Sequence, residues 1–164
     1  MFREMRRKRQ RLSIDVCAEI LNRNTSGVLS VSGDDGYPYA VPLSYVYDGV
    51  ALYFHCAKSG HKLDAIARNE KVSFCVIDRD EIVPEKYTTY YRSVILFGRA
   101  KIITDNGEML SAIEKLAIKY NPTGDKENRD AAINKEFSAL CIVRIDIDYM
   151  TGKEAIELVK NKMR

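Results

Sequence analysis

The hydrophobic pattern between residues 27 and 56 consists of three short runs, rich in apolar residues and bounded by turn signals, as is typical of β-strands. The runs predict strands at Gly27–Ser32, Tyr39–Tyr47 and Val50–Cys56. Gly33–Gly36 and Asp48-Gly49 are the turns between them, and such short turns join antiparallel neighbours because parallel strands need a long crossover. Pro42 has no N–H for the ladder, so we expect the second strand to be an edge strand or to be bulged there.

Helices and three further strands are predicted around this meander. Ser13 can cap a first helix whose hydrophobic residues recur at helical spacing. Later patterns predict helices at Ser59–Asn69, Asp105–Tyr120 and Asp130–Phe137, and strands at Lys71–Asp78, Ser93–Ile103 and Ala139–Ile147. The polar segment Arg79–Arg92 and the loop Asn121–Arg129 connect them. Six strands with only short helices between them favour a closed or nearly closed barrel over a doubly wound α/β fold.

Composition places this predicted barrel in an ordinary globular protein of 164 residues, 46% hydrophobic and 30% charged. No apolar run approaches the ~18 residues that a membrane-spanning helix needs, and no apolar stretch follows the N-terminal charges as in a secretory signal. We therefore expect a cytoplasmic location and no membrane contact. The four cysteines form no C-x-x-C pair and lie in apolar segments, which is typical of reduced thiols.

The net charge of +3 is concentrated at the N-terminus. Residues 1–11 contain six basic side chains and one acidic side chain, and the other 153 residues contain 20 basic and 22 acidic ones. We therefore divide the chain into a basic N-terminal arm (residues 1–12) and a single domain (residues 13–164). The arm could reach nucleic-acid phosphates, but a solvated or partner-covering segment is the preferred interpretation, because a nucleic-acid protein usually carries a basic face on its folded body as well.

The connection from the third strand to the next helix is the most informative part of the chain. The strand ends at Cys56 and the helix begins near Gly60, where free backbone N–H groups and the helix dipole favour an anion. Gly60 allows a close backbone approach, and Lys58, His61 and Lys62 add donors. A phosphate group is the natural occupant of such a turn.

The two histidines, His55 and His61, have alternative roles. His55 and Cys56 point to opposite faces of a strand, and His61 with Asp64 makes only two ligands, so we expect no metal site. His55 is either a structural strand histidine or a catalytic one. The tyrosines at 87, 90 and 91 either cover the barrel or stack on an aromatic ligand. None of the common nucleophile, nucleotide-loop or zinc-protease motifs is present.

Four segments together carry a resemblance that no single one would support. They are Gly36-Tyr37-Pro38-Tyr39-Ala40-Val41-Pro42, Leu52-Tyr53-Phe54-His55-Cys56-Ala57, Gly60-His61-Lys62-Leu63-Asp64 and Lys71-Val72-Ser73-Phe74. In this order they resemble the pyridoxamine phosphate oxidase-like split barrels, and within them the nitroimidazole-resistance branch, which the ending from Arg144 to Ala155 also resembles. The resemblance implies a mainly β fold, a six-stranded antiparallel Greek-key split barrel with flanking helices. It also implies a homodimer with two FMN sites at the interface.

The resemblance assigns roles to individual residues. The flavin ring would lie along Val41, Pro42, Leu43 and Ser44, with His55 and Cys56 beside the ring and ribityl chain. The phosphate would be held by Lys62 and His61, supported by Lys58 and the amides around Gly60. The family's oxidases usually carry Arg and then Lys at the last two positions, and His61 replaces the Arg here. The partner subunit would contribute the segment with Tyr90, Ser93 and Val94.

The implied activity is an FMN-dependent oxidoreductase. Reduced FMN would pass electrons to a small planar acceptor such as a nitroimidazole, and His55 would hydrogen-bond the acceptor or supply a proton. One alternative is a non-catalytic dimer that holds flavin or haem. Another is a regulatory module that uses its basic arm.

Overall fold

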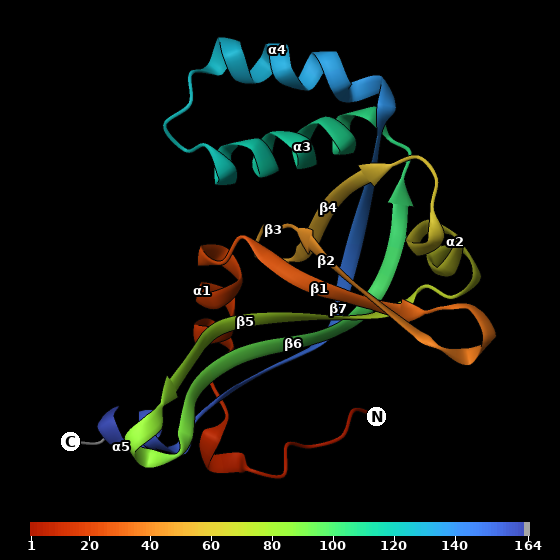
Figure 1. The fold of residues 1–164 in the computed structure, drawn as a ribbon. Coiled ribbons are helices and arrows are strands. Elements are labelled where there is room, and N and C mark those ends of the chain that lie inside the picture. Colours follow the sequence, from red (N-terminus) through yellow and green to blue (C-terminus); the bar gives the residue numbers. More distant parts are fainter. Residues whose placement is uncertain (163–164) are drawn as a thin grey trace.

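One antiparallel sheet of seven strands forms the centre of the protein in the computed structural model, which describes residues 1–162 (Figure 1). The strands are β1 (Ser26–Ser32), β2 (Pro38–Ser44), β3 (Val46–Tyr47), β4 (Ala51–Ala57), β5 (Lys71–Val83), β6 (Thr88–Ile103) and β7 (Leu140–Glu154), in the order β2-β1-β5-β6-β7-β4-β3. In this order β5, β6 and β7 are successive neighbours and β4 returns beside β7, which is a Greek-key arrangement. The mainly β class with flanking helices is confirmed.

The two edge strands, β2 and β3, are separated in the sequence by one residue, Tyr45. The sheet must therefore curl until its edges meet, although no ladder joins them and the barrel is not closed. The prediction of one strand over Tyr39–Tyr47, and with it the count of six, is wrong. Tyr45 and Val46 are both buried, because at this point the chain leaves one edge of the sheet for the other and the alternation of a single strand is broken. The edge position predicted from Pro42 is confirmed for β2.

The later strands are longer than the sequence predicted. β5 and β6 continue as a hairpin through residues 79–92, which the sequence analysis left as a polar connection, and Tyr87 turns the hairpin with a φ of 48°. β7 runs on to Glu154 instead of ending at Ile147. The hairpin extends away from the rest of the sheet (Figure 1). Most side chains of residues 79–92 are exposed or half-buried, with Val83 the buried exception, so they lack the regular alternation that reveals a strand.

Three of the described helices begin at residues whose side chains cap them. Ser13 accepts from the Val16 N–H at the start of α1 (Ile14–Arg23), and Asp105 accepts from the Glu108 N–H at the start of α3 (Asn106–Tyr120), as predicted. Asp125 caps α4 (Lys126–Glu136), which therefore begins four residues before the predicted Asp130. The other helices are α2 (His61–Arg68) and α5 (Ile156–Lys162). Within the described residues, no helix is long and apolar enough to cross a membrane.

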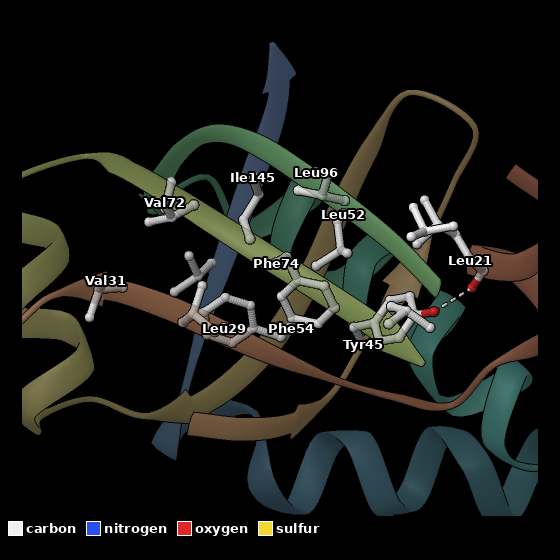
Figure 2. Close-up of a cluster of buried hydrophobic side chains, with 14 of the residues drawn as sticks. Leu21, Leu29, Val31, Tyr45, Leu52, Phe54, Val72, Phe74, Leu96 and Ile145 are labelled. Atoms are coloured by element: carbon white, nitrogen blue, oxygen red, sulfur yellow. Dashed lines mark hydrogen bonds between the residues drawn. The ribbon is translucent and has the colours of Figure 1, made fainter. Parts of the chain in front are cut away.

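Two hydrophobic cores lie on opposite faces of β4. Leu52 and Phe54 point into the curled sheet, where Figure 2 shows them with Phe74, Leu96 and Ile145. Ala51 and Tyr53 point the other way, into a second core beneath α3 and α4. His55 follows on this second face because side chains alternate along a strand. The position of His55 toward the α3–α4 hairpin therefore follows from the packing of β4.

Both ends of the N-terminal arm contact the sheet. Gln10 is buried and donates to the carbonyl of Glu154 at 2.9 Å, and the N–H of Leu12 donates to the carbonyl of Gly152 at 3.0 Å. Near the beginning of the chain, the ring of Phe2 stacks on that of Tyr149. Most side chains between these anchors are exposed.

Candidate functional site

The turn from β4 to α2 presents backbone N–H groups at the start of a helix. Gly60 is the N-cap residue and has a φ of +135°, a conformation that residues with a Cβ rarely adopt. In the described part of the chain, no side chain caps this helix. The N–H groups of Leu63 and Asp64 turn back to the carbonyl of Gly60. The helix start near Gly60 is as the sequence predicted, and free amides at such a position suit an anion.

Lys58 and Lys62 bring two positive charges to this turn. Both lie close enough to Cys141, which faces Cys56 across the β4–β7 ladder, to act electrostatically on its thiol. Burial raises the pKa of Cys56 to about 11 in spite of Lys62, so both thiols stay protonated near neutral pH. Neither lysine forms an ion pair with a carboxylate among residues 1–162. Their charges are therefore available to a ligand.

His61 is turned toward the β1–β2 turn. Its ring stacks on that of Tyr39 with the centroids 4.2 Å apart, and its Nε2 lies 3.4 Å from a carboxylate oxygen of Asp34. Asp34 also accepts from Arg68 at 2.6 Å. The imidazole is thus already engaged by an acidic partner, which leaves Lys58, Lys62 and the amides as the main anion-binding groups. The contacts of Asp34 and Tyr39 with His61 could not be predicted from the sequence, because only the fold brings the β1–β2 turn to α2.

The predicted flavin-lining residues of β2 alternate along the edge of the sheet. Val41 and Leu43 are half-buried against the main core, whereas Pro42 and Ser44 are exposed on the other face. Of the four, Ser44 shares a cavity with His55. The structure therefore brings the end of β2 and the outer face of β4 together.

This cavity, of about 630 Å³, lies between His55 and the α3–α4 hairpin. Its apolar wall includes Ile113, Leu116 and Ile133, and Arg129 is one of its polar residues. Desolvation by the surrounding protein lowers the pKa of His55, although much of its side chain remains accessible to solvent. The sequence analysis missed the cavity because it placed residues 121–129 in a loop; Asp125 followed by Glu127 was the available signal for an earlier helix start.

The segment predicted to serve a partner's site lies far from this turn in the same chain. In the sheet, Ser93 pairs with Lys153 of β7, whereas Cys56, next to the turn, pairs with Cys141 of the same strand. The two positions on β7 are twelve residues apart. Ser93 and Tyr90 are half-buried, whereas Val94 is fully buried in the main core, so the Val94 side chain cannot face another molecule. One chain therefore does not assemble all the predicted site residues. The described residues also contain no group of three or more His, Cys, Asp or Glu side chains that could hold a metal ion.

A curled antiparallel sheet, with an uncapped and lysine-flanked helix start after β4, is the arrangement of a split-barrel protein. The chain matches the model of the pyridoxamine 5'-phosphate oxidase family over residues 13–154, and it therefore belongs to that family. A search of curated protein sequences gave no match.

Solved structures show the same fold. A FAD-binding protein from Mesorhizobium loti is 28% identical, with a TM-score of 0.64, 89% of this chain and 97% of that chain covered. A proposed 5-nitroimidazole antibiotic resistance protein from Bacteroides thetaiotaomicron is 20% identical, with a TM-score of 0.75 and coverage of 88% and 86%. A FAD and heme binding protein from Mycobacterium smegmatis is 22% identical, with a TM-score of 0.73 and coverage of 90% and 73%. At these two lower identities the likeness concerns the fold alone.

The environment of His55 predicts its titration. We expect NMR titration of the full chain to give His55 a pKa below 6.5, because burial disfavours the imidazolium. Since the unfolded chain then binds the proton more readily, stability should fall as the pH drops through 6.5 toward the folded pKa. The resonance is assigned by its loss in His55→Ala. A pKa of 6.5 or above would show that the imidazole is solvated or faces a carboxylate.

Proposed function

We propose that the chain binds FMN, with the phosphate at the β4–α2 turn and the flavin ring along β2 toward His55. The observation that carries this proposal is the pair of lysines, Lys58 and Lys62, beside the start of α2: within residues 1–162, neither lysine pairs with a carboxylate and no side chain caps the helix. A phosphate monoester has the charge and the acceptor oxygens that such a site binds. Two solved relatives, one a FAD-binding protein and the other a FAD and heme binding protein, support a flavin as the class of ligand. One anion-binding turn suits the single phosphate of FMN.

The proposed activity is an oxidoreductase that passes electrons to a small planar acceptor. A bound flavin would supply the redox chemistry. His55, on the outer face of β4, would donate a hydrogen bond or a proton to the acceptor, and its lowered pKa favours the neutral imidazole as the hydrogen-bond donor near pH 7. A nitroimidazole is one such acceptor, since the related protein from Bacteroides thetaiotaomicron is a proposed 5-nitroimidazole antibiotic resistance protein.

We further propose that two copies associate through the outer face of β5 and β6. Ile77, Ile95 and Phe97 are exposed there to 61%, 39% and 38%. Large apolar side chains gathered on one sheet face typically mark an interface. Association through this face would bring residues 90–94 of each copy toward the other, where the resemblance places the second half of the site.

Removal of the Lys62 charge tests the position of the phosphate. We expect Lys62→Gln to weaken FMN binding about tenfold, about 1.4 kcal/mol, because it removes one charged contact to the phosphate. Riboflavin, which has no phosphate, should bind both proteins equally. Isothermal titration calorimetry measures the two ligands, and Lys135→Gln on the exposed side of α4 controls for net charge. Equal losses for both ligands, or no loss for FMN, would contradict the proposed phosphate site.

Reoxidation of the bound flavin tests the activity. With FMN bound to saturation and reduced without oxygen, a 5-nitroimidazole should restore the absorbance near 450 nm faster than it does with free reduced FMN. His55→Ala should slow this step roughly tenfold to a hundredfold, because it removes a positioned donor, whereas His61→Ala should have a smaller effect. Equal rates for bound and free flavin would favour the non-catalytic binding protein, and an absorbance band near 400 nm after purification would indicate haem.

A charge on the exposed sheet face tests the dimer. Ile77→Arg should convert the protein to monomers in sedimentation velocity, because burial of an unpaired charge opposes association. Ile118→Arg on α3 is the matched control, since Ile118 is also exposed, to 47%, but lies away from the sheet face. The proposal fails if the wild-type protein is a monomer at micromolar concentration, or if both variants behave alike.

A further inference from the structure

The cavity beneath the α3–α4 hairpin is large enough for a small molecule. Its volume of about 630 Å³ falls within the range, roughly 300–1,000 Å³, of ligand pockets. One wall is apolar and is formed by Ile113, Leu116 and Ala117 of α3 together with Ile133 of α4 and Leu140. Ser44 and His55 lie at the edge of the same cavity. An apolar body could therefore pack against the helices and reach the outer face of β4.

Arg129 provides a buried hydrogen-bond donor, its Nε, that has no partner among the described residues. Its Nε atom is buried and forms no hydrogen bond within residues 1–162, and its Nη1 makes only a long contact, 3.5 Å, with the carbonyl of Gly124. A buried donor without a partner costs about 1–3 kcal/mol, and Arg129 belongs to the lining of the cavity. The Nε and Nη groups of arginine form a planar edge that matches the two oxygens of a carboxylate.

Other charged groups at the cavity leave this edge free. Asp125 lies near Arg129, but its two carboxylate oxygens accept from the N–H groups of Glu127 and Asn128 as the cap of α4. No carboxylate in the described chain forms an ion pair with Arg129. Glu136 lines the cavity two helical turns further along α4. The acidic groups therefore do not satisfy the guanidinium.

We propose that this cavity binds a small molecule with an apolar body and a carboxylate, and that Arg129 binds the carboxylate. The apolar body lies against Leu116 and Ile133, and the far end of the molecule reaches Ser44 and His55. The proposal that the cavity binds a carboxylate depends on Arg129 and does not require a flavin. The further step, that the molecule is the electron acceptor, rests on the proposed flavin function and defines its substrate class as apolar monocarboxylates.

A matched pair of probes tests this inference on the purified full chain. Isothermal titration calorimetry with 2-naphthoate and 2-naphthamide compares two molecules of the same shape that differ in charge. We expect 2-naphthoate to bind the wild-type protein at least tenfold more tightly than 2-naphthamide. Arg129→Gln should abolish this preference, because it removes the charged planar donor. Lys135→Gln removes the same charge from the same helix without lining the cavity, and it should keep the preference.

A cavity-filling variant locates the binding. Ala132 lines the cavity from an exposed position on α4, so Ala132→Phe should leave the fold intact, as circular dichroism can check, and should weaken both probes. The proposal is overturned if the wild-type protein binds neither probe, or if 2-naphthoate keeps its advantage in Arg129→Gln or its affinity in Ala132→Phe. FMN affinity, measured on the same variants, should not change. Naphthoate binding without FMN binding would refute the flavin function and leave the cavity assignment standing, and FMN binding without naphthoate binding would do the reverse.

Discussion

The passage of the chain through Tyr45 is the constraint on which the rest of the structure depends. This residue alone connects the two edges of the sheet, and its side chain is fully buried. Its hydroxyl donates to the carbonyl of Leu21 at 2.8 Å, and its ring meets Phe74 edge-on with the centroids 5.1 Å apart (Figure 2). Lys119 lies over the ring, and burial lowers the pKa of this lysine to about 8. Contacts from α1, α3 and β5 thus hold the curl of the sheet at one point.

The curl decides where the functional groups lie. Because β3 must follow β2 after one residue and then pair with β4, the end of β2 and the outer face of β4 share one cavity through Ser44 and His55. Shortly after His55, β4 ends and the chain enters α2 next to the β1–β2 turn, where Asp34 lies beside His61. The anion-binding turn and the cavity are therefore set by the same strand, β4, from its end and from its outer face.

The sequence predicted those parts of this arrangement that depend on local pattern. Ser13 and Asp105 cap helices as expected, because a cap is a contact within one turn of helix. The turn at Gly60 was predicted for the same reason. The break at Tyr45 was missed because alternation cannot show which edge a strand joins. Arg129 was also missed, since a buried donor can be recognised only when α4 and the loop before it are placed around the cavity.

The two cores support two different regions of the molecule, the β4–α2 turn and the cavity. The anion-binding turn is supported by the main core through Phe54 and Leu63, whereas the cavity depends on the second core through Leu116, Ile133 and Ile142. Substitutions at the cavity-lining positions of α4 can therefore reshape the cavity while the β4–α2 turn stays intact, since distant sites without shared contacts act independently. Solved structures with the same fold share only 20–28% of their residues with this chain. In such a family the barrel fixes the fold, and we infer that ligand specificity follows from side chains placed on it, such as Arg129, whose buried Nε forms no hydrogen bond within residues 1–162.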